Sequence, residues 1–226
     1  MVNLVVAIPL MLLPVTIFCL LYLPSGHKLP RSAVPSPKNL TVILLTFDEN
    51  HAPESPLSDT IFYSAQRRLQ WDDFLAKPSP SGPSAAVAYT SFSYDGNSSL
   101  AHDTLKITLR LQVFFIKSAS WVRPDAKNNY ALAHEQLHFD ITRLVVERFK
   151  QKLRQTALNR DDYDSIIQYQ YLQSFREMNR LQYKFDQETN HGLNPAAQTR
   201  WRDKVNVGLK NNGVLPEELG IESIKF

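Results

Sequence analysis

Apolar and polar residues alternate strictly between Thr104 and Ile116, and this pattern constrains the fold more than any other stretch of the sequence. Successive side chains of a β-strand point to opposite faces, so a period of two gives one apolar face and one polar face. The stretch therefore predicts a long strand with one face packed on a core. The core-facing positions are Leu105, Ile107, Leu109, Leu111, Val113 and Phe115.

Two other segments are typical of strands. Residues 39–47 form an apolar run that suits a buried strand, and residues 85–94 alternate more weakly, as a half-buried strand does. The Asp95–Asn97 segment that follows predicts a turn because Asp, Gly and Asn favour turn conformations. We expect these strands to form an antiparallel sheet with residues 104–116.

Apolar residues then recur at helical spacing in two long segments. The first begins near Pro124 and runs to about Gln155, and the second extends from about Asp162 to Phe185. The short link between them predicts an antiparallel helix pair. The predicted fold class is therefore α+β, with an antiparallel sheet packed on two long antiparallel helices. Beyond Trp201 the sequence predicts polar turns and a short last element.

The first of these helices contains His134-Glu135-Gln136-Leu137-His138, an HExxH sequence. Residues four apart lie on one face of a helix, so His134 and His138 are spaced to bind one tetrahedral Zn²⁺ ion. Glu135 projects about 100° further round the helix. That direction suits a general base that acts on a zinc-bound water.

The third zinc ligand is expected from the end of the second helix, which an antiparallel pair returns toward the HExxH sequence. His191 is the leading candidate, and Asp186 and Glu188 are the alternatives, because His, Asp and Glu all bind zinc. Asp186 also suits a hydrogen bond to a ligand imidazole. Tyr183 is placed either to stabilise an oxyanion or to pack. A Cys ligand is excluded, since Cys19 is the only cysteine and lies in the N-terminal segment.

Four further residues are not expected to bind the metal. His27 and His102 have no neighbours at ligand spacing, and His51 lies in a polar loop, where we expect it to be solvated. Asp140 lies two residues after His138, about 200° round the helix. We expect Asp140 to pair with a basic group instead.

The N-terminus is apolar enough to interact with a membrane. Residues 1–24 include a run from Leu4 to Leu23 that is long enough to cross a bilayer, so they predict a transmembrane anchor or a signal segment. Residues 25–38 contain several prolines and predict an extended tether, and residues 39–226 predict one zinc metallopeptidase-like domain. Basic residues follow the apolar run, which leaves its orientation open, and we expect the domain to be exported.

The charge of the chain does not favour nucleic acid as a partner. The 226 residues have a formal net charge of +3, and Lys and Arg are scattered along the sequence. Nucleic-acid binding proteins concentrate these residues on one face or stripe.

Several motifs in this order resemble a known family. They are residues 69–74 (LQWDDF), 120–124 (SWVRP), 134–141 (HEQLHFDI) and 183–192 (YKFDQETNHG). Together they resemble a bacterial family of exported domains that is described as predicted secreted zinc-dependent proteases. The resemblance covers most of the chain from about residue 69 to residue 201. It implies a zincin-like metallopeptidase site and a bacterial cell-envelope location.

The sequence therefore predicts a zinc-dependent enzyme that hydrolyses a polypeptide substrate. One zinc ion per chain would polarise a water molecule, and Glu135 would deprotonate it. An extended substrate is expected to add to the edge of the strand at residues 104–116. One alternative is a structural zinc site in an inactive or peptide-binding envelope domain. Another is a membrane-tethered domain whose histidines bind no metal.

Overall fold

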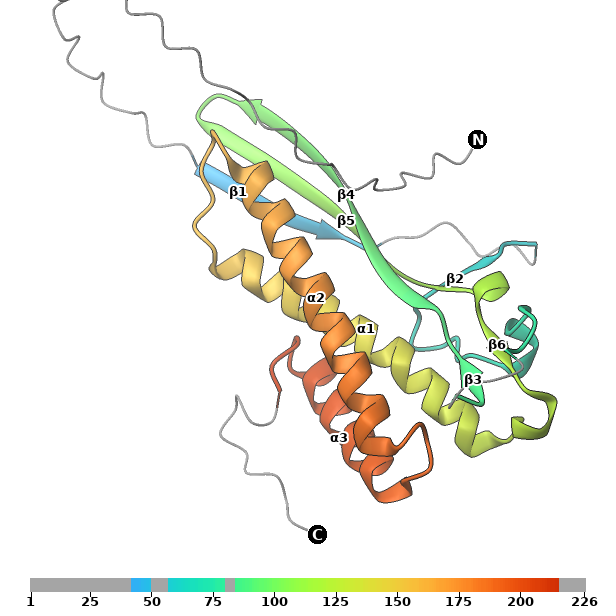
Figure 1. Ribbon diagram of the computed structural model, residues 1–226. Helices are drawn as coiled ribbons and strands as arrows, with labels where there is room; N and C mark the ends of the chain where they lie inside the picture. Colours follow the sequence, from blue (N-terminus) through green and yellow to red (C-terminus); the bar gives the residue numbers. More distant parts are fainter. Residues whose placement is uncertain (1–41, 50–56, 80–83, 216–226) are drawn as a thin grey trace, which may run out of the picture. The chain divides into compact units, whose positions relative to one another are not determined.

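The computed structural model describes residues 42–49, 57–79 and 84–215, which belong to one compact unit, Asn39–Phe226 (Figure 1). Three predicted features lie outside the described residues. They are the anchor at residues 1–24, the tether at residues 25–38 and the loop that contains His51. No helix in the described part of the chain has the length and apolar character that a bilayer crossing requires.

The long alternating stretch forms a strand, as predicted, and this strand is the central one of the main sheet. This strand, β5 (Thr104–Ile116), buries every second side chain. Strand β4 (Thr90–Ala101) pairs with it antiparallel along nearly its whole length. Strands β1 (Val42–Asp48) and β2 (Thr60–Phe62) pair with different parts of β5, and two-residue strands β3 (Ala86–Val87) and β6 (Trp121–Val122) form a separate antiparallel pair.

The predicted antiparallel sheet is wrong in one respect, because β1 runs parallel to β5 and the sheet is mixed. An apolar run shows that a strand is buried but does not show its direction. The suggestion that β5 offers a free edge to a substrate is also wrong. Strand β4 pairs with one edge of β5, and β1 and β2 pair with the other edge. Both edges of β5 are therefore occupied by other strands.

The turn predicted at Asp95–Asn97 is also wrong, because β4 continues through these residues to Ala101. Asp95 lies opposite Arg110, and Gly96 lies opposite Leu109. Cross-strand pairing with β5 therefore overrides the local turn preference. The chain reverses after Ala101 instead, where His102 adopts a left-handed conformation with φ of 52°.

Three helices follow the strands. Helices α1 (Asn129–Gln155) and α2 (Tyr163–Thr189) form the predicted antiparallel pair. Pro124 begins only a short 3₁₀ turn, and α1 starts after Asn128, whose side chain accepts a hydrogen bond from the Ala131 N–H. Helix α2 extends beyond the predicted end at Phe185.

The third helix, α3 (Pro195–Lys210), was not predicted from the sequence. Asn194 caps it by accepting a hydrogen bond from the Ala197 N–H, and Pro195 occupies the first turn, where it needs no N–H partner. Its apolar stripe consists mainly of Ala197, Trp201 and Val205, which is too short to stand out in the sequence.

Helix α1 contributes to both hydrophobic clusters of the described residues. The larger cluster packs α1 and α2 against the sheet, and Phe92, Phe115, Phe139 and Phe149 are its largest fully buried aromatic side chains. The smaller one joins α1, α2 and α3 through Leu137, Ile141, Leu144, Phe185, Trp201 and Val205. Each large apolar side chain that is fully buried contributes about 1.5–3 kcal/mol. The position of α1 is therefore fixed from two sides.

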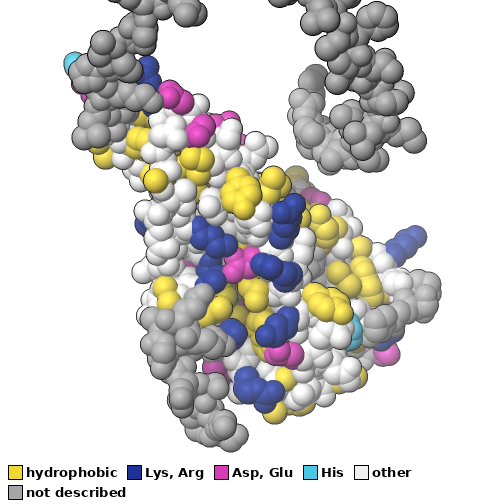
Figure 2. Space-filling view, turned by 60° about the vertical axis from the view of Figure 1, so that its left-hand side comes forward, with side chains coloured by type: hydrophobic (Ala, Val, Ile, Leu, Met, Phe, Trp, Pro, Cys, Tyr) yellow, Lys and Arg dark blue, Asp and Glu magenta, His cyan; other side chains and the backbone are white. Residues whose placement is uncertain are grey.

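Charged side chains on the helices are partly paired with one another. Figure 2 shows Lys and Arg side chains together with Asp and Glu side chains on one face of the molecule. Arg148 and Lys152 of α1 both bind Glu177 of α2, at 2.6 and 2.5 Å. Burial opposes the charged form of Glu177, but these two cations outweigh it and lower its pKa. These contacts help to fix α2 along α1.

We predict that Gly213→Ala destabilises the contact between the end of α3 and α1. Gly213 has φ of +92°, and an added Cβ would lie 2.6 Å from the Arg148 backbone nitrogen. The strain and the clash should lower the free energy of unfolding by about 2 kcal/mol or more, measured by urea denaturation. Gly96→Ala is the control, because its Cβ would meet only the Leu109 side chain at 3.6 Å. Equal stability of the two variants would contradict this assignment.

Candidate metal centre

Two histidine side chains project from the same face of α1 toward α2. His134 and His138 are one helical turn apart, and their ring centroids lie 5.1 Å from each other at nearly a right angle. Phe185 of α2 stacks on the His134 ring at 4.5 Å and meets the His138 ring edge-on at 4.9 Å. This packing restricts the directions in which the two imidazoles can point.

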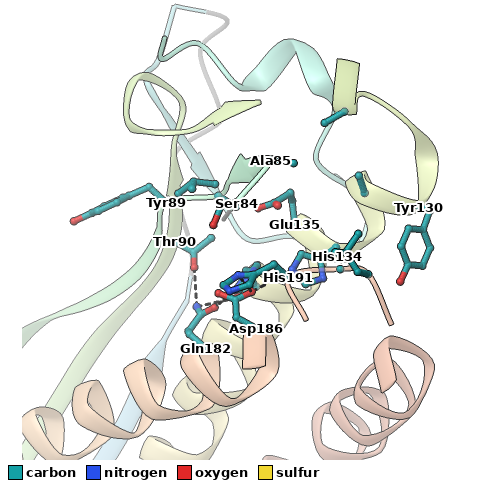
Figure 3. Close-up of a pocket in the computed structure, with 18 of the residues that line it drawn as sticks. Ser84, Ala85, Tyr89, Thr90, Tyr130, His134, Glu135, Gln182, Asp186 and His191 are labelled. Carbon is teal, nitrogen blue, oxygen red and sulfur yellow. Dashed lines mark hydrogen bonds and ion pairs between the residues drawn. The ribbon is translucent and has the colours of Figure 1, made fainter. Parts of the chain in front are cut away.

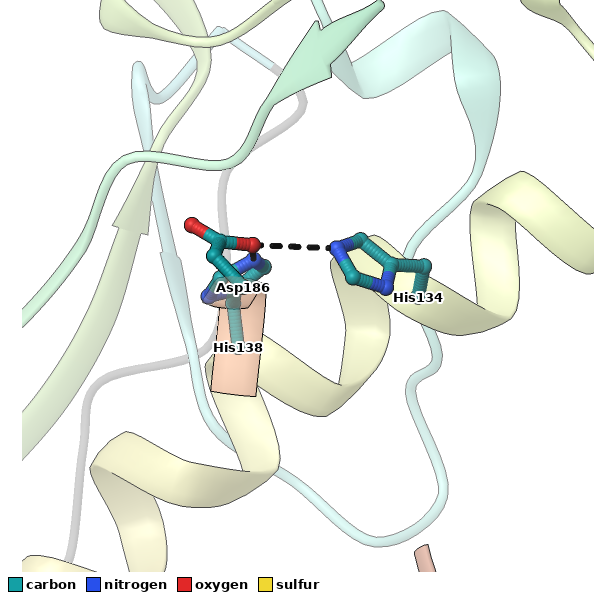
Figure 4. Close-up of side chains that lie close together, drawn as sticks. All are labelled: His134, His138 and Asp186. Atoms are coloured by element: carbon teal, nitrogen blue, oxygen red, sulfur yellow. Dashed lines mark hydrogen bonds and ion pairs between the residues drawn. The ribbon is translucent and has the colours of Figure 1, made fainter. Parts of the chain in front are cut away.

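Asp186 of α2 completes a three-residue cluster. Its Oδ1 lies 3.2 Å from His134 Nε2 and 3.1 Å from His138 Nε2 (Figure 4). The three groups offer ligand atoms that all lie within 4.8 Å of one another. Among the described residues, His134, His138 and Asp186 are the group of His and acidic side chains whose ligand atoms lie close enough together to hold one metal ion.

The electrostatics of the cluster favour positive charge between the three side chains. Burial opposes protonation of His138, but the hydrogen bond and the charge of Asp186 outweigh it and raise the His138 pKa to about 9. Burial likewise opposes the charged form of Asp186, yet hydrogen bonds from His134 and His138 hold its pKa well below the usual range. A metal cation would take the place of the imidazole protons at the same point.

The Nδ1 atom of each imidazole forms a hydrogen bond with a glutamine of another helix. His134 Nδ1 lies 3.1 Å from Oε1 of Gln198 in α3, and His138 Nδ1 bonds to Oε1 of Gln182 in α2. The amide orientations follow from their Nε2 groups. Nε2 of Gln198 donates to the Tyr130 carbonyl, and Nε2 of Gln182 donates to the His138 carbonyl.

Because an amide oxygen can only accept, Nδ1 of both imidazoles carries a hydrogen. The Nε2 atoms are then left to face the centre of the cluster. The sequence prediction missed both glutamines. Helical spacing could have indicated Gln182, which lies one turn before Asp186 on the same face of α2, whereas no pattern indicates Gln198.

The Glu135 carboxylate lies beside the cluster and is directed away from α2. The side chain is buried, and its carboxylate accepts a hydrogen bond from the backbone N–H of Ala88, just after β3. Burial raises the pKa of Glu135, while the nearby His138 and His134 and the Ala88 N–H lower it. The residue is thus fixed between α1 and the segment that contains β3.

A cavity of about 620 Å³ opens above these side chains (Figure 3). Its floor includes His134, Glu135, His138 and Asp186, one wall is residues 84–90, and another is formed by the segment that joins α2 to α3. The arrangement places a carboxylate and a candidate metal cluster in one accessible space.

The remaining predicted site residues differ in their positions. His191 lines the cavity with Nδ1 4.0 Å from Asp186 Oδ1, in a left-handed conformation with φ of 52°. Glu188 instead accepts a hydrogen bond from Trp201 Nε1 at 2.7 Å. Tyr183 is 68% exposed and is not among the cavity residues. The structure therefore brings Asp186 to the two histidines, with His191 next to it.

The difference between Asp186 and His191 follows from where α2 ends. Because the helix continues to Thr189, Asp186 still lies on its α1-facing side. His191 comes after the left-handed cap at Asn190, and its backbone N–H donates to the Asp186 carbonyl at 2.8 Å. Gly192 then approaches the His134 ring, where a Cβ would lie 3.4 Å from it.

Side chains on the opposite side of α1 bind the segment between β2 and β3. Asp140 accepts hydrogen bonds from Tyr63 and Gln136, at 3.0 and 2.9 Å, and forms an ion pair with Arg68 at 3.4 Å. Gln136 in turn accepts a hydrogen bond from the Leu69 N–H. Asp140 therefore pairs with a basic group, as predicted, and takes no part in the metal cluster.

Comparison with protein-family models, with curated proteins and with solved structures finds no match to this chain. The function is accordingly argued from the geometry of the centre and its cavity.

Proposed function

We propose that this protein binds one zinc ion through His134, His138 and Asp186 and hydrolyses peptide bonds, with Glu135 as general base. The observation that carries the proposal is the cavity, whose floor contains both the three convergent ligand groups and the buried Glu135 carboxylate. A purely structural zinc site is closed by four protein ligands, whereas a catalytic site keeps one position accessible.

The ligand set suits zinc in particular. Two imidazole nitrogens and one carboxylate oxygen are a common catalytic zinc set, whereas magnesium and calcium prefer oxygen ligands alone. The amides of Gln182 and Gln198 hold each Nδ1–H, which orients the Nε2 lone pairs of His134 and His138 toward Asp186. Such partners fix ligand orientation and increase metal affinity.

The chain's own residues supply the proton transfers. A bound zinc ion would serve as a Lewis acid for the attacking water and the substrate carbonyl. Glu135, which lines the cavity beside the cluster, would accept the proton of the water and pass it to the leaving amine. A zincin-like fold, an exported location in a bacterial cell envelope and membrane attachment through residues 1–24 belong to this proposal on the sequence patterns alone.

Zinc content should distinguish the ligands from their neighbours. We expect the purified full-length chain to hold about one zinc ion, and we expect His138→Ala and Asp186→Ala to lose it, because each removes one of three ligands. His191→Ala should keep it, since the metal set is complete without that side chain. Elemental analysis after gel filtration measures the stoichiometry, with Tyr183→Phe as an exposed control. Loss of zinc from His191→Ala alone would replace Asp186 by His191 as the third ligand.

Removal of the general base should separate chemistry from metal binding. We expect Glu135→Gln to retain zinc and to lose about 10²–10⁴-fold in kcat on an unfolded protein substrate, because the amide cannot accept the proton. The measurement combines elemental analysis with the rate of peptide release. Unchanged activity in a zinc-loaded Glu135→Gln variant would overturn the mechanism.

The two glutamines should affect metal affinity. Gln198→Met removes the acceptor for His134 Nδ1–H and should weaken zinc binding about 10–100-fold, as loss of such partners typically does. Gln198→Glu keeps an acceptor oxygen and should retain most of the affinity. Competition with a chromophoric chelator measures both, and the melting temperature confirms that each variant folds. Equal weakening by the two substitutions would show that the acceptor is not what matters.

A further inference from the structure

Strand β1 forms an open edge of the main sheet (Figure 1). Its strand partner among the described residues is β5, which lies on one side of it. The opposite edge of the sheet, formed by β4, is partly capped by α2, because the Tyr171 hydroxyl donates to the Phe92 carbonyl at 3.1 Å. The outer edge of β1 is therefore the one that another strand can reach.

Half of the backbone groups of β1 point to this outer edge. The Val42 N–H donates to the Asp103 carbonyl at 2.8 Å, so residue 42 and every second residue after it face β5. Ile43, Leu45 and Phe47 therefore direct their N–H and C=O groups away from the sheet. Within the described residues, these N–H and C=O groups have no hydrogen-bond partner.

The side chains of β1 do not protect this edge from another strand. Proteins usually cover an open edge or interrupt it with Lys, Pro or a bulge. The sequence of β1, VILLTFD, contains neither residue, and its register with β5 has no bulge. Val42 and Leu44 are 49% and 50% exposed. Asp48, the one charged residue of β1, forms an ion pair with Arg110 of β5 at 3.3 Å. Charge therefore does not oppose the approach of a similar strand.

A second copy of β1 would satisfy the outer edge completely. When two copies run antiparallel about a two-fold axis at Leu45, this residue faces its own copy and Ile43 faces Phe47. These are hydrogen-bonded positions, so every outward N–H meets a C=O. An axis one residue earlier or later would leave one outward residue without a partner in β1. The edge is thus complementary to itself in one register.

The side chains agree with this register. Ile43, Leu45 and Phe47 pack against the larger hydrophobic cluster, on the core face of the sheet. The two-fold axis would place the β-branched Ile43 opposite the aromatic Phe47, which is a favourable cross-strand pair. Two copies would therefore join their cores as well as their backbones.

The outer edge of β1 is remote from the candidate metal centre. Arg154 of α1 lies over the Phe47 ring at 5.0 Å, and Lys150 binds Glu49, just after β1, at 2.6 Å. Lys150 is about 18 Å along the helix from His138. No residue of β1 lines the cavity. Pairing at β1 would leave the cavity open, so it does not depend on the proposed hydrolysis.

We infer that two copies of this chain associate through β1 and form one continuous sheet across a two-fold axis. The contact is small, because the seven residues of β1 span about 23 Å. Such a strand buries less than the roughly 800 Å² that each partner contributes to a standard interface. The dimer is therefore reversible, with a dissociation constant on the order of 10 μM.

A disulfide at the axis tests the register. The probe is the full-length chain with Leu45→Cys and Cys19→Ser, in which the two Cα atoms of residue 45 should lie about 5.5 Å apart, within disulfide range. We expect mild oxidation to give a linked dimer on a non-reducing gel. Thr108→Cys with Cys19→Ser is the control, because the two β5 strands would lie about 14 Å apart. Equal yields from the two variants, or no dimer from Leu45→Cys, would overturn the inference.

Sedimentation of the wild-type full-length chain in detergent measures association without a substitution at the edge. We expect the protein mass per particle to rise from one chain to two as the concentration passes the dissociation constant. A chain that stays monomeric at about ten times that concentration would overturn the inference. A mass of two chains without a disulfide at residue 45 would place the dimer contact elsewhere and overturn it as well.

A proline at the edge tests the backbone pairing. Ile43→Pro removes an outward N–H, and Pro is tolerated at an edge position whose N–H has no partner in the sheet. Ile43→Ala, the matched control, shortens the side chain but keeps the N–H. We expect Ile43→Pro to weaken dimerisation about 30-fold relative to Ile43→Ala, since each dimer loses two hydrogen bonds. Equal association of the two folded variants would exclude this pairing, and the disulfide and the wild-type sedimentation decide if Ile43→Pro does not fold.

Discussion

The contact between His134 and His138 of α1 and Asp186 of α2 is the interaction on which the rest of the structure depends. It places three polar groups between the two helices, with Phe185 packed against both rings. Buried polar groups are costly unless they are paired, so the register that brings these groups together is favoured over registers that leave the two imidazoles unpaired. The antiparallel α1–α2 pair and the candidate centre are therefore specified by the same contact.

Helix α1 carries several buried polar side chains, and three of those in the HExxH sequence are paired with three different parts of the fold. Gln198 of α3 meets His134, the Ala88 N–H meets Glu135, and the Leu69 N–H meets Gln136. An unpaired member would cost about 1–3 kcal/mol. The polar residues of the HExxH helix thus fix the positions of α3, of the β3 segment and of the loop before it. Loss of any of these elements would disturb the centre as well as the core.

Sequence reasoning predicted the parts of this arrangement that depend on one periodic pattern. The long strand at residues 104–116, the two long helices and the return of residues 183–192 to the HExxH sequence all followed from spacing. Features that depend on how elements meet did not follow from it. The parallel direction of β1 and the short helix α3 are set by packing. The position of Asp186 in place of His191 between the two histidines depends on α2 continuing one further turn to Thr189.

The hydrogen-bond acceptors of both His Nδ1–H groups are neutral amides. Gln182 and Gln198 accept the Nδ1–H groups without adding charge, whereas carboxylates at these positions would add two negative charges to a buried site. With amides, the carboxylates of Asp186 and Glu135 alone would balance the two positive charges of a zinc ion, if one binds as proposed. The loaded centre would then be neutral overall.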